Sequence, residues 1–395
     1  MKKKVIGAAA LAVFAAAAHA QSSVTLYGLI DTGIVYTNNQ SATGAPGTGH
    51  SNYQESSSLL SNTVWGLKGS EDLGSGLNAI FRLENGFNLN NGKTTYAGTI
   101  FGRQAYVGLQ DNKYGTLTFG RQYDSVVDFL GPIALSNYGD GNNLAAHPFD
   151  NDNVDDSFYI DNSVKYETPT YAGLQFESLY AFSNAAGGFS NDRVYSFGLS
   201  YSHGPVNLAA AYMQINNGAG GFLDNNSTGA LSSNDNPNLP AQNERVMGAG
   251  GNYTFGKATV GALWTHSLFN NAAAAVDNGD AAGAGTLAFN DLHFDNFEVN
   301  AHYQLTPAIS FSGAYTFTQA AYSGPDGSAD PKWHQVTLMA DYAFSKRTDV
   351  YAEAVYQHSY GAAGGMPLAS AFINGLSPSS TDNQIAATVG IRTRF

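Results

Sequence analysis

The chain of 395 residues has 18 basic and 31 acidic side chains, and only 12% of its residues are charged, while another 12% are aromatic. It has no cysteine, which excludes disulfides and thiolate metal sites, and its acidic balance excludes a typical nucleic-acid partner, which needs a basic surface. Soluble domains are usually about a quarter charged, so this composition is more typical of a β-barrel with a lipid-facing wall.

The first twenty residues predict a signal peptide. Three lysines, Lys2 to Lys4, precede an alanine-rich apolar run over 5–18, and Ala18-His19-Ala20 fits a small-x-small cleavage site. The run is short for a membrane-spanning helix, and no later segment offers about 18 consecutive apolar residues. We expect a signal peptide over 1–20 and one barrel domain over 21–395. Without the three lysines, 15 basic residues face 31 acidic ones, a mature net charge of −16.

Apolar and polar residues alternate with period two along the mature chain. The alternation is clear over 195–201, 297–305, 336–344 and 350–357. Successive side chains of a strand point to opposite faces, so each segment predicts a strand with one apolar and one polar face. A soluble β-sandwich would show the same alternation. However, the predicted strands that contain these stretches run to roughly nine to thirteen residues, the length that a tilted strand needs to cross a bilayer. Aromatic residues near their ends are typical of interfacial girdles.

Short and long connections alternate between the predicted strands. Short turns rich in Gly, Pro, Asn, Asp and Ser are expected at 72–76, 111–115, 169–173, 203–205, 256–257, 306–307 and 345–348. Long polar connections are expected at about 37–62, 88–100, 125–160, 184–192, 217–243, 270–292, 323–332 and 361–383. This order predicts an all-β, 16-stranded antiparallel transmembrane β-barrel with both chain ends on the short-turn side. A barrel of this size is expected to hold an aqueous channel rather than a packed core.

Five motifs occur in a fixed order over the mature chain, namely Ser23–Asp31, Trp65–Gly74, Gly102–Leu109, Gly120–Gln122 and Val389–Phe395. Together they resemble the Gram-negative general porins (OmpC-like porins), most of all their betaproteobacterial branch. The resemblance implies an outer-membrane homotrimer in which the third external loop, about 125–160, folds inward to narrow the pore. The amphipathic last strand ends at Phe395, which resembles the signal read by the barrel-assembly machinery.

Alternation along the strands predicts which charged residues face the channel. Arg82 and Glu84 share the polar parity of their strand, and Lys68 lies opposite the apolar residues beside it. Arg103 and Arg121 match pore arginines of the porins by motif, so their role is implied by the resemblance. Arg121 falls on the parity of the apolar residues of its strand, a conflict that a β-bulge would resolve.

The loop that the resemblance folds inward is acidic and has no lysine or arginine. Asp124 precedes it, and Asp128 and Asp140 are its candidates for the constriction. Two positions that are usually arginine in relatives are Val64 and Tyr159 here, so we expect a less cationic constriction and a weak preference for cations. The other acidic residues of the loop are Asp150, Asp152, Asp155 and Asp156.

The sequence thus predicts a passive channel for small hydrophilic solutes and ions, surrounded by outer-membrane lipid and lipopolysaccharide. No nucleophile with a base is evident, so neither an enzyme nor a cofactor or metal is expected. Two alternatives remain open. One is a channel specific for sugars or small carboxylates, guided by tyrosines such as Tyr27, Tyr123, Tyr138 and Tyr159. The other is a structural or adhesive barrel with a closed lumen, against which the Gly- and Ser-rich lumen faces weigh.

Overall fold

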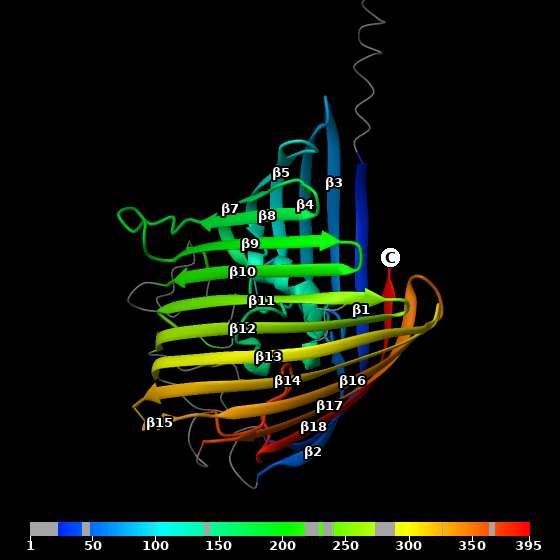
Figure 1. The fold of residues 1–395 in the computed structure, drawn as a ribbon, viewed down its shortest axis with the longest axis vertical. Helices are drawn as coiled ribbons and strands as arrows, with labels where there is room; N and C mark the ends of the chain where they lie inside the picture. The colour runs from blue at the N-terminus through cyan, green and yellow to red at the C-terminus, as the bar shows by residue number, and fades with distance from the viewer. Residues whose placement is uncertain are drawn as a thin grey trace, which may run out of the picture.

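The computed structural model describes residues 23–41, 48–96, 98–137, 143–217, 229–231, 239, 241–272, 289–325, 327–362 and 368–395. The predicted signal peptide and two predicted pore residues, Tyr138 and Asp140, lie outside these ranges. The described residues form one antiparallel sheet that closes on itself, because the first strand pairs with the last (Figure 1). None of the helices in the described ranges is long and apolar enough to cross a bilayer.

The strands follow one another around the wall in chain order. They are β1 (Ser23–Gln40), β2 (His50–Ser57), β3 (Val64–Gly74), β4 (Leu77–Gly86), β5 (Gln104–Asp111), β6 (Gly115–Gln122), β7 (Ile160–Glu167), β8 (Leu174–Ala181), β9 (Arg193–His203), β10 (Val206–Asn216), β11 (Asn243–Phe255), β12 (Ala258–Ala272), β13 (Phe289–Thr306), β14 (Ile309–Gly324), β15 (Gly327–Ala329), β16 (Lys332–Ala343), β17 (Thr348–Tyr360) and β18 (Asn383–Arg394). Between β6 and β7 lie helix α2 (Ser125–Leu130) and the 3₁₀ turns η2 (Gly131–Ile133), η3 (Leu135–Asn137), η4 (Asn143–Ala145) and η5 (Pro148–Asp150).

These eighteen segments fill sixteen positions in the wall. β2 pairs with the second half of β1 and β3 with its first half, so they form one strand interrupted over 58–63. The short β15 pairs with the end of β14, and β16 pairs with the rest of β14 on the same edge, so β15 and β16 together fill one position in the wall. The prediction of a 16-stranded antiparallel barrel is therefore confirmed.

The seven predicted short turns are confirmed, and each joins two neighbouring strands of the wall. Gly76 and Gly115 illustrate why these turns are glycine-rich: their φ angles of 89° and 95° lie in the left-handed region, which strains most other residues. The C-terminus lies at the same end as these turns, where the backbone of Phe395 exchanges two hydrogen bonds with Gly28 of β1 (3.0 and 3.1 Å).

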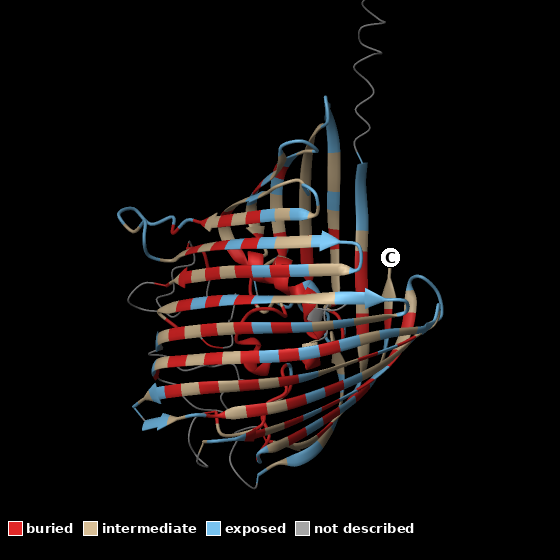
Figure 2. Cartoon of the chain, viewed as in Figure 1, coloured by how far each residue is buried: buried red, intermediate tan, exposed pale blue. Residues whose placement is uncertain are grey.

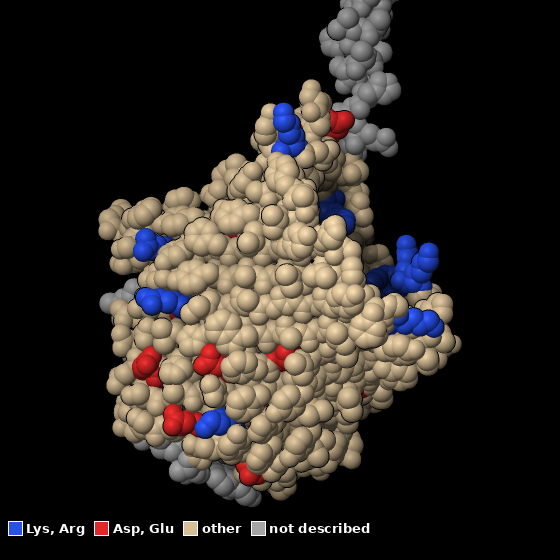
Figure 3. Space-filling view, viewed as in Figure 1, with Lys and Arg blue, Asp and Glu red and all other residues tan. Residues whose placement is uncertain are grey.

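The wall is apolar outside and polar inside, the reverse of a soluble barrel. Outward residues such as Leu338 and Val389 are 63% and 60% exposed, whereas inward residues such as Gln335 and Thr388 are buried. Figure 2 shows the alternation along each strand, and Figure 3 shows that most of the outer surface of β9 to β14 is uncharged. Lipid is the solvent that this outer surface suits.

Three segments of the described chain fold into the lumen. The longest comprises 124–137 and 143–159, and in it α2 packs its apolar side against the inner faces of β9 to β11. Further along it, Phe149 stacks on Phe372 (ring centroids 5.0 Å apart) beside Trp333 of β16. Phe372 belongs to the second inward segment, around 368–380, whose Leu368, Ile373 and Leu376 are also buried. Part of the lumen is thus a packed core, which differs from the expected open interior.

The third inward segment is the interruption between β2 and β3. The carboxylate of Asp31 in β1 accepts hydrogen bonds from the backbone N–H groups of Leu60 (2.8 Å) and Ser61 (2.5 Å) and from the hydroxyl of Tyr351 (2.6 Å). Leu59 and Leu60 are buried in the lumen. These contacts satisfy backbone groups that leave the strand ladder. The open space that remains in the lumen lies beside β1 and β3 to β11.

Candidate functional site

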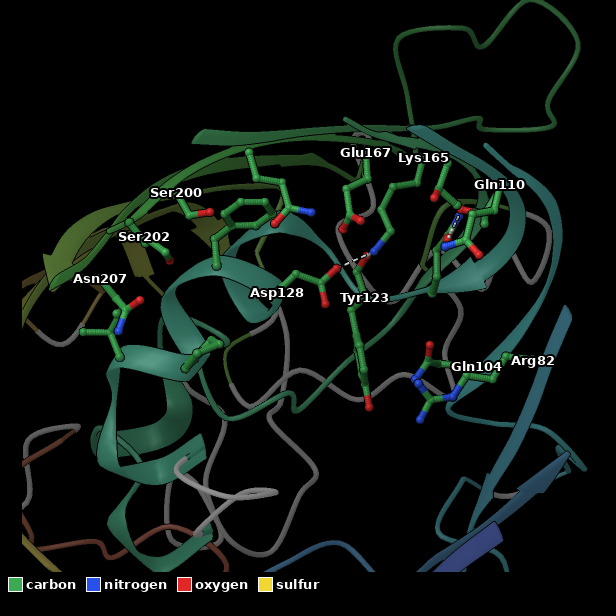
Figure 4. Close-up of a pocket in the computed structure, with 18 of the residues that line it drawn as sticks. Arg82, Gln104, Gln110, Tyr123, Asp128, Lys165, Glu167, Ser200, Ser202 and Asn207 are labelled. Atoms are coloured by element: carbon green, nitrogen blue, oxygen red, sulfur yellow. Dashed lines mark hydrogen bonds and ion pairs between the residues drawn. The ribbon is translucent and has the colours of Figure 1, made fainter. Parts of the chain in front are cut away.

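Two cavities lie on the open side of the lumen. The larger, of about 660 Å³, is bounded by β4 to β11 and by the inward segment. The second, of about 500 Å³, lies against β1, β3 and β4. Four residues line both cavities: Arg82 of the wall, and Tyr123, Asp128 and Pro132 of the inward segment. Figure 4 shows Arg82 on the wall facing Tyr123 and Asp128, so the passage between the two cavities runs between β4 and the inward segment.

The wall side of this passage is a hydrogen-bonded cluster. The Arg82 guanidinium donates to the Tyr27 hydroxyl (2.7 Å) and to Glu84 (2.5 Å), and Tyr27 also donates to Glu84 (2.7 Å). The Lys68 ammonium lies 5.3 Å from the centre of the Tyr27 ring. Lys68 is exposed and the Arg82 side chain is 33% exposed, whereas Glu84 is buried. The alternation-based placement of these side chains agrees with the structure, and the cluster presents positive charge to the passage.

Arg103 joins this wall cluster to the inward segment. Its guanidinium donates to Glu84 (3.0 Å), to Asp156 (2.9 Å) and to the hydroxyl of Tyr123 (2.7 Å). Burial raises the pKa of Asp156, although the Arg103 charge opposes that shift. Because Arg103 is buried and forms salt bridges on two sides, it fixes the distance between wall and segment rather than offering a free charge to solutes.

Arg121 does not line either cavity. The register of β6 against β7 shifts between Gly120 and Gln122, which is the bulge that its parity demanded. Its guanidinium forms a salt bridge with Asp161 (2.7 Å) and lies 5.2 Å from the centre of the Tyr159 ring. Arg103 lies at the same distance from that ring. Tyr159 therefore stands between the two arginines.

The predicted acidic residues of the loop have different surroundings. Asp124 is buried and caps α2, since one carboxylate oxygen accepts from Val126 N–H (2.7 Å) and the other from Asn153 (2.8 Å). Burial raises its pKa to about 6. Asp128, one turn later, lines both cavities. Besides Asp124, three further acidic residues of the loop are buried, namely Asp150, Asp152 and Asp155.

Lys165 was not among the residues singled out from the sequence. Its ammonium forms a salt bridge with Asp128 and lies 3.4 Å from Glu177, and it lines the larger cavity (Figure 4). The signal was present, because Lys165 alternates with the apolar Val164 and Tyr166 in β7. Its partner could not be read from β7 alone, since α2 supplies Asp128.

Of the tyrosines proposed as a track for sugars, Tyr27 and Tyr123 line cavities, Tyr159 is buried, and Tyr138 lies outside the described residues. Tyr96, Tyr159 and Tyr123 form a row with ring centroids 5.3 and 5.2 Å apart. Tyr159 is completely buried, and only Tyr123 of the three lines the cavities. Tyr27 also lines the smaller cavity. This row therefore offers little exposed ring surface along the passage.

Comparisons with known proteins agree with this architecture. A family model described as Gram-negative porin matches residues 7–362. The chain is 33% identical over 387 residues to an outer membrane porin protein of Bordetella pertussis, covering 91% of this chain and 95% of that protein. It is 27% identical over 405 residues to outer membrane porin protein 32 of Delftia acidovorans, covering 100% of both. An anion-selective porin from Comamonas acidovorans shares the fold with a TM-score of 0.70 and 24% identity, covering 95% of this chain and 100% of that one.

Proposed function

The chain belongs to the Gram-negative porin family, and from that premise we propose that solutes pass between β4 and the inward segment, at the point where Arg82 faces Asp128. The protein is an outer-membrane β-barrel channel and not an enzyme. The solutes are small, hydrophilic molecules and ions that diffuse passively. The observation that supports this path is that Arg82, Tyr123, Asp128 and Pro132 line both cavities.

Charge at this point is nearly balanced. Arg82 faces Asp128 across the passage, and Lys165, which is paired with Asp128, and Glu167 line the larger cavity beside it. The expected cation preference depended on the loop acids as a set, and burial of most of them removes that basis. We therefore propose weak selectivity, with the sign set by Arg82 on one side and Asp128 on the other.

Reversal potentials across a planar bilayer in a KCl gradient test this proposal. Arg82→Gln should shift the reversal potential toward cation selectivity, and Asp128→Asn should shift it toward anion selectivity, because each removes one charge from the passage. Ser202→Ala is the matched control, since Ser202 lines the larger cavity without charge. Equal reversal potentials for wild type and both charge variants would refute the proposed path.

The same recordings distinguish the alternative of a substrate-specific channel. A non-specific channel keeps its conductance when a neutral sugar is added, apart from the loss caused by higher viscosity. Saturable block by one sugar or one small carboxylate would favour the specific channel instead. The buried position of Tyr159 supports the non-specific alternative.

We also propose a homotrimer in which the outer surface of β1 to β5 forms the contact between copies. Support comes from Val24, Leu26 and Val107, whose outward side chains are 65%, 58% and 59% exposed. Cross-linking of the purified protein before and after heating tests this assembly. Three-fold cross-linked species that disappear on heating are expected, and monomers alone would contradict the trimer.

Two proposals concern export. Cleavage after Ala20 would leave Gln21 as the first residue, which N-terminal sequencing of protein from outer membranes would detect.

Recognition of Phe395 by the barrel-assembly machinery is supported by its terminal place beside β1. Phe395→Ala should then reduce assembly in cells more than refolding in detergent, and an equal loss in both assays would indicate a purely structural role.

A further inference from the structure

The outer surface has a compact group of potentially cationic side chains on β16 and β17. Lys332, His334 and His358 all point outward, because they alternate with the buried Trp333 and Gln357. His334 and His358 are directly opposite each other in the register of the two strands, and Lys332 is opposite Tyr360. Only 12% of the chain is charged, so three such groups at neighbouring outward positions need a reason.

The rings of this group are held in a stack. Tyr360 is nearly parallel to His334 (centroids 5.5 Å apart, 9°) and to His358 (5.9 Å, 15°). The Lys332 ammonium lies 5.8 Å from the Tyr360 ring centre. His334 Nδ1 contacts the Tyr315 hydroxyl (2.6 Å), and His358 Nδ1 donates to Asn383 (3.1 Å). Fixing Nδ1 in both rings leaves each Nε2 edge for a ligand.

The position of the group along the strands places it at a membrane interface. Outward residues from Tyr342 to Val336 are apolar or aromatic, and His334 is the next outward residue toward the long loops. The same outward row begins at Phe344, which is 65% exposed at the short-turn end, and from there to His334 the chain rises roughly 33 Å, or about 25 Å along the barrel axis for a typical tilt. An apolar band is about 25 Å tall. The group therefore lies at the level of the lipid headgroups on the side opposite to the short turns.

A second outward histidine pair shows what distinguishes this group. His266 of β12 contacts Asp295 of β13 (3.0 Å), and its ring lies 5.9 Å from that of His293. The Asp295 carboxylate therefore already supplies a negative charge beside that pair. By contrast, the salt bridges of the described residues include none to Lys332, His334 or His358, although Asp330 lies only two residues before Lys332.

We propose that Lys332, His334 and His358, stacked around Tyr360, bind a phosphate group of lipid A in the outer leaflet. The Lys332 ammonium supplies positive charge, and the two imidazole rings add ring nitrogens beside it, so a phosphate monoester would find both an opposite charge and hydrogen-bond partners here. The inference depends on the outer-membrane barrel but not on the proposed solute path.

The test uses the full-length protein refolded in detergent, with binding of diphosphoryl lipid A measured by native mass spectrometry. We expect the Lys332→Gln, His334→Gln, His358→Gln triple variant to bind about tenfold more weakly than wild type. The His266→Gln, His293→Gln variant is the matched control and should bind as wild type does.

Two further probes assign the effect to the phosphate and to this lipid. Dephosphorylated lipid A should bind wild type and the triple variant equally weakly, and phosphatidylglycerol should bind more weakly than diphosphoryl lipid A. Wild-type affinity in the triple variant would overturn the proposal, and so would dephosphorylated lipid A or phosphatidylglycerol binding as tightly as diphosphoryl lipid A. Unchanged heat-modifiability on gels will show that each variant still forms the barrel, so a loss of binding does not reflect misfolding.

Discussion

His147 offers a direct test of how the inward segment is held to the far wall. Its imidazole is buried between Asp152 of the same segment (2.6 Å) and Glu298 of β13 (3.1 Å). Asp152 also accepts hydrogen bonds from Thr265 and Asn296 of the wall. His147→Leu keeps an apolar side chain of similar size but leaves two buried carboxylates without their shared cation. Loss of one partner from a buried charge pair costs about 3–5 kcal/mol.

The assay is hydrogen–deuterium exchange of peptides covering 143–159. If the segment detaches from the wall before its amides exchange, protection should fall with the opening equilibrium, by about 10²- to 10⁴-fold for that energy. Peptides from β13 should keep their protection, since the wall strands remain paired. His302→Leu is the matched control, because His302 is on the same inward face of β13 but contacts Ser312. Unchanged protection over 143–159 in His147→Leu would refute the role of this contact.

The pH dependence of the wild type gives an independent check. Burial alone would lower the pKa of His147, but the carboxylates of Asp152 and Glu298 raise it well above its ordinary value. Because the pKa of His147 is higher in the native protein than in the unfolded chain, its protonation stabilises the attached segment. This stabilisation is complete below the ordinary histidine pKa and is lost as the pH rises through the native pKa. Protection over 143–159, corrected for intrinsic exchange, should therefore decrease at alkaline pH in wild type and not in His147→Leu.

Three further changes test the barrel closure, the strand interruption and the passage. Gly28→Ala should reduce the free energy of unfolding by about 1–3 kcal/mol, because its Cβ would meet the Phe395 ring and a backbone oxygen 2.8 Å away. The barrel should then unfold at a lower temperature on gels, and an unchanged transition would contradict this closure. Tyr351→Phe removes one hydrogen bond from buried Asp31 and should reduce the free energy of unfolding by about 1–3 kcal/mol, which lowers the denaturant midpoint. An unchanged midpoint would show that water replaces the hydroxyl. Lys165→Gln frees two carboxylates, so the KCl reversal potential should move toward cation selectivity, and a shift toward anions would be inconsistent with the proposed passage.

The sequence by itself determined the wall of this protein. Period-two alternation is a local property, because neighbouring side chains of a strand must point to opposite faces. It therefore assigned Lys68, Arg82 and Glu84 to the lumen before any strand was paired. Turn composition likewise located all seven short turns, since a turn is a property of four or five consecutive residues. Lys165 could have been found by the same alternation.

The tertiary structure decided which charges meet water. Asp124 and Asp128 are four residues apart and look alike in the sequence, yet Asp124 caps a helix and is buried while Asp128 lines both cavities. The difference arises from where α2 docks on the wall. Similarly, Arg103 and Arg121 share one motif-based expectation, but salt bridges to Asp156 and Asp161 separate them on two sides of a tyrosine.

The packed part of the lumen also depends on tertiary contacts. His147 and Glu298 are 151 residues apart, and Tyr351 and Asp31 are 320 apart, so no local pattern relates them. The apolar residues of the inward segments occur within long connections that are polar on average, where alternation gives no face to assign. Local chemistry fixes a strand and its two faces, whereas the path through the barrel depends on which distant segments fill the rest of its interior.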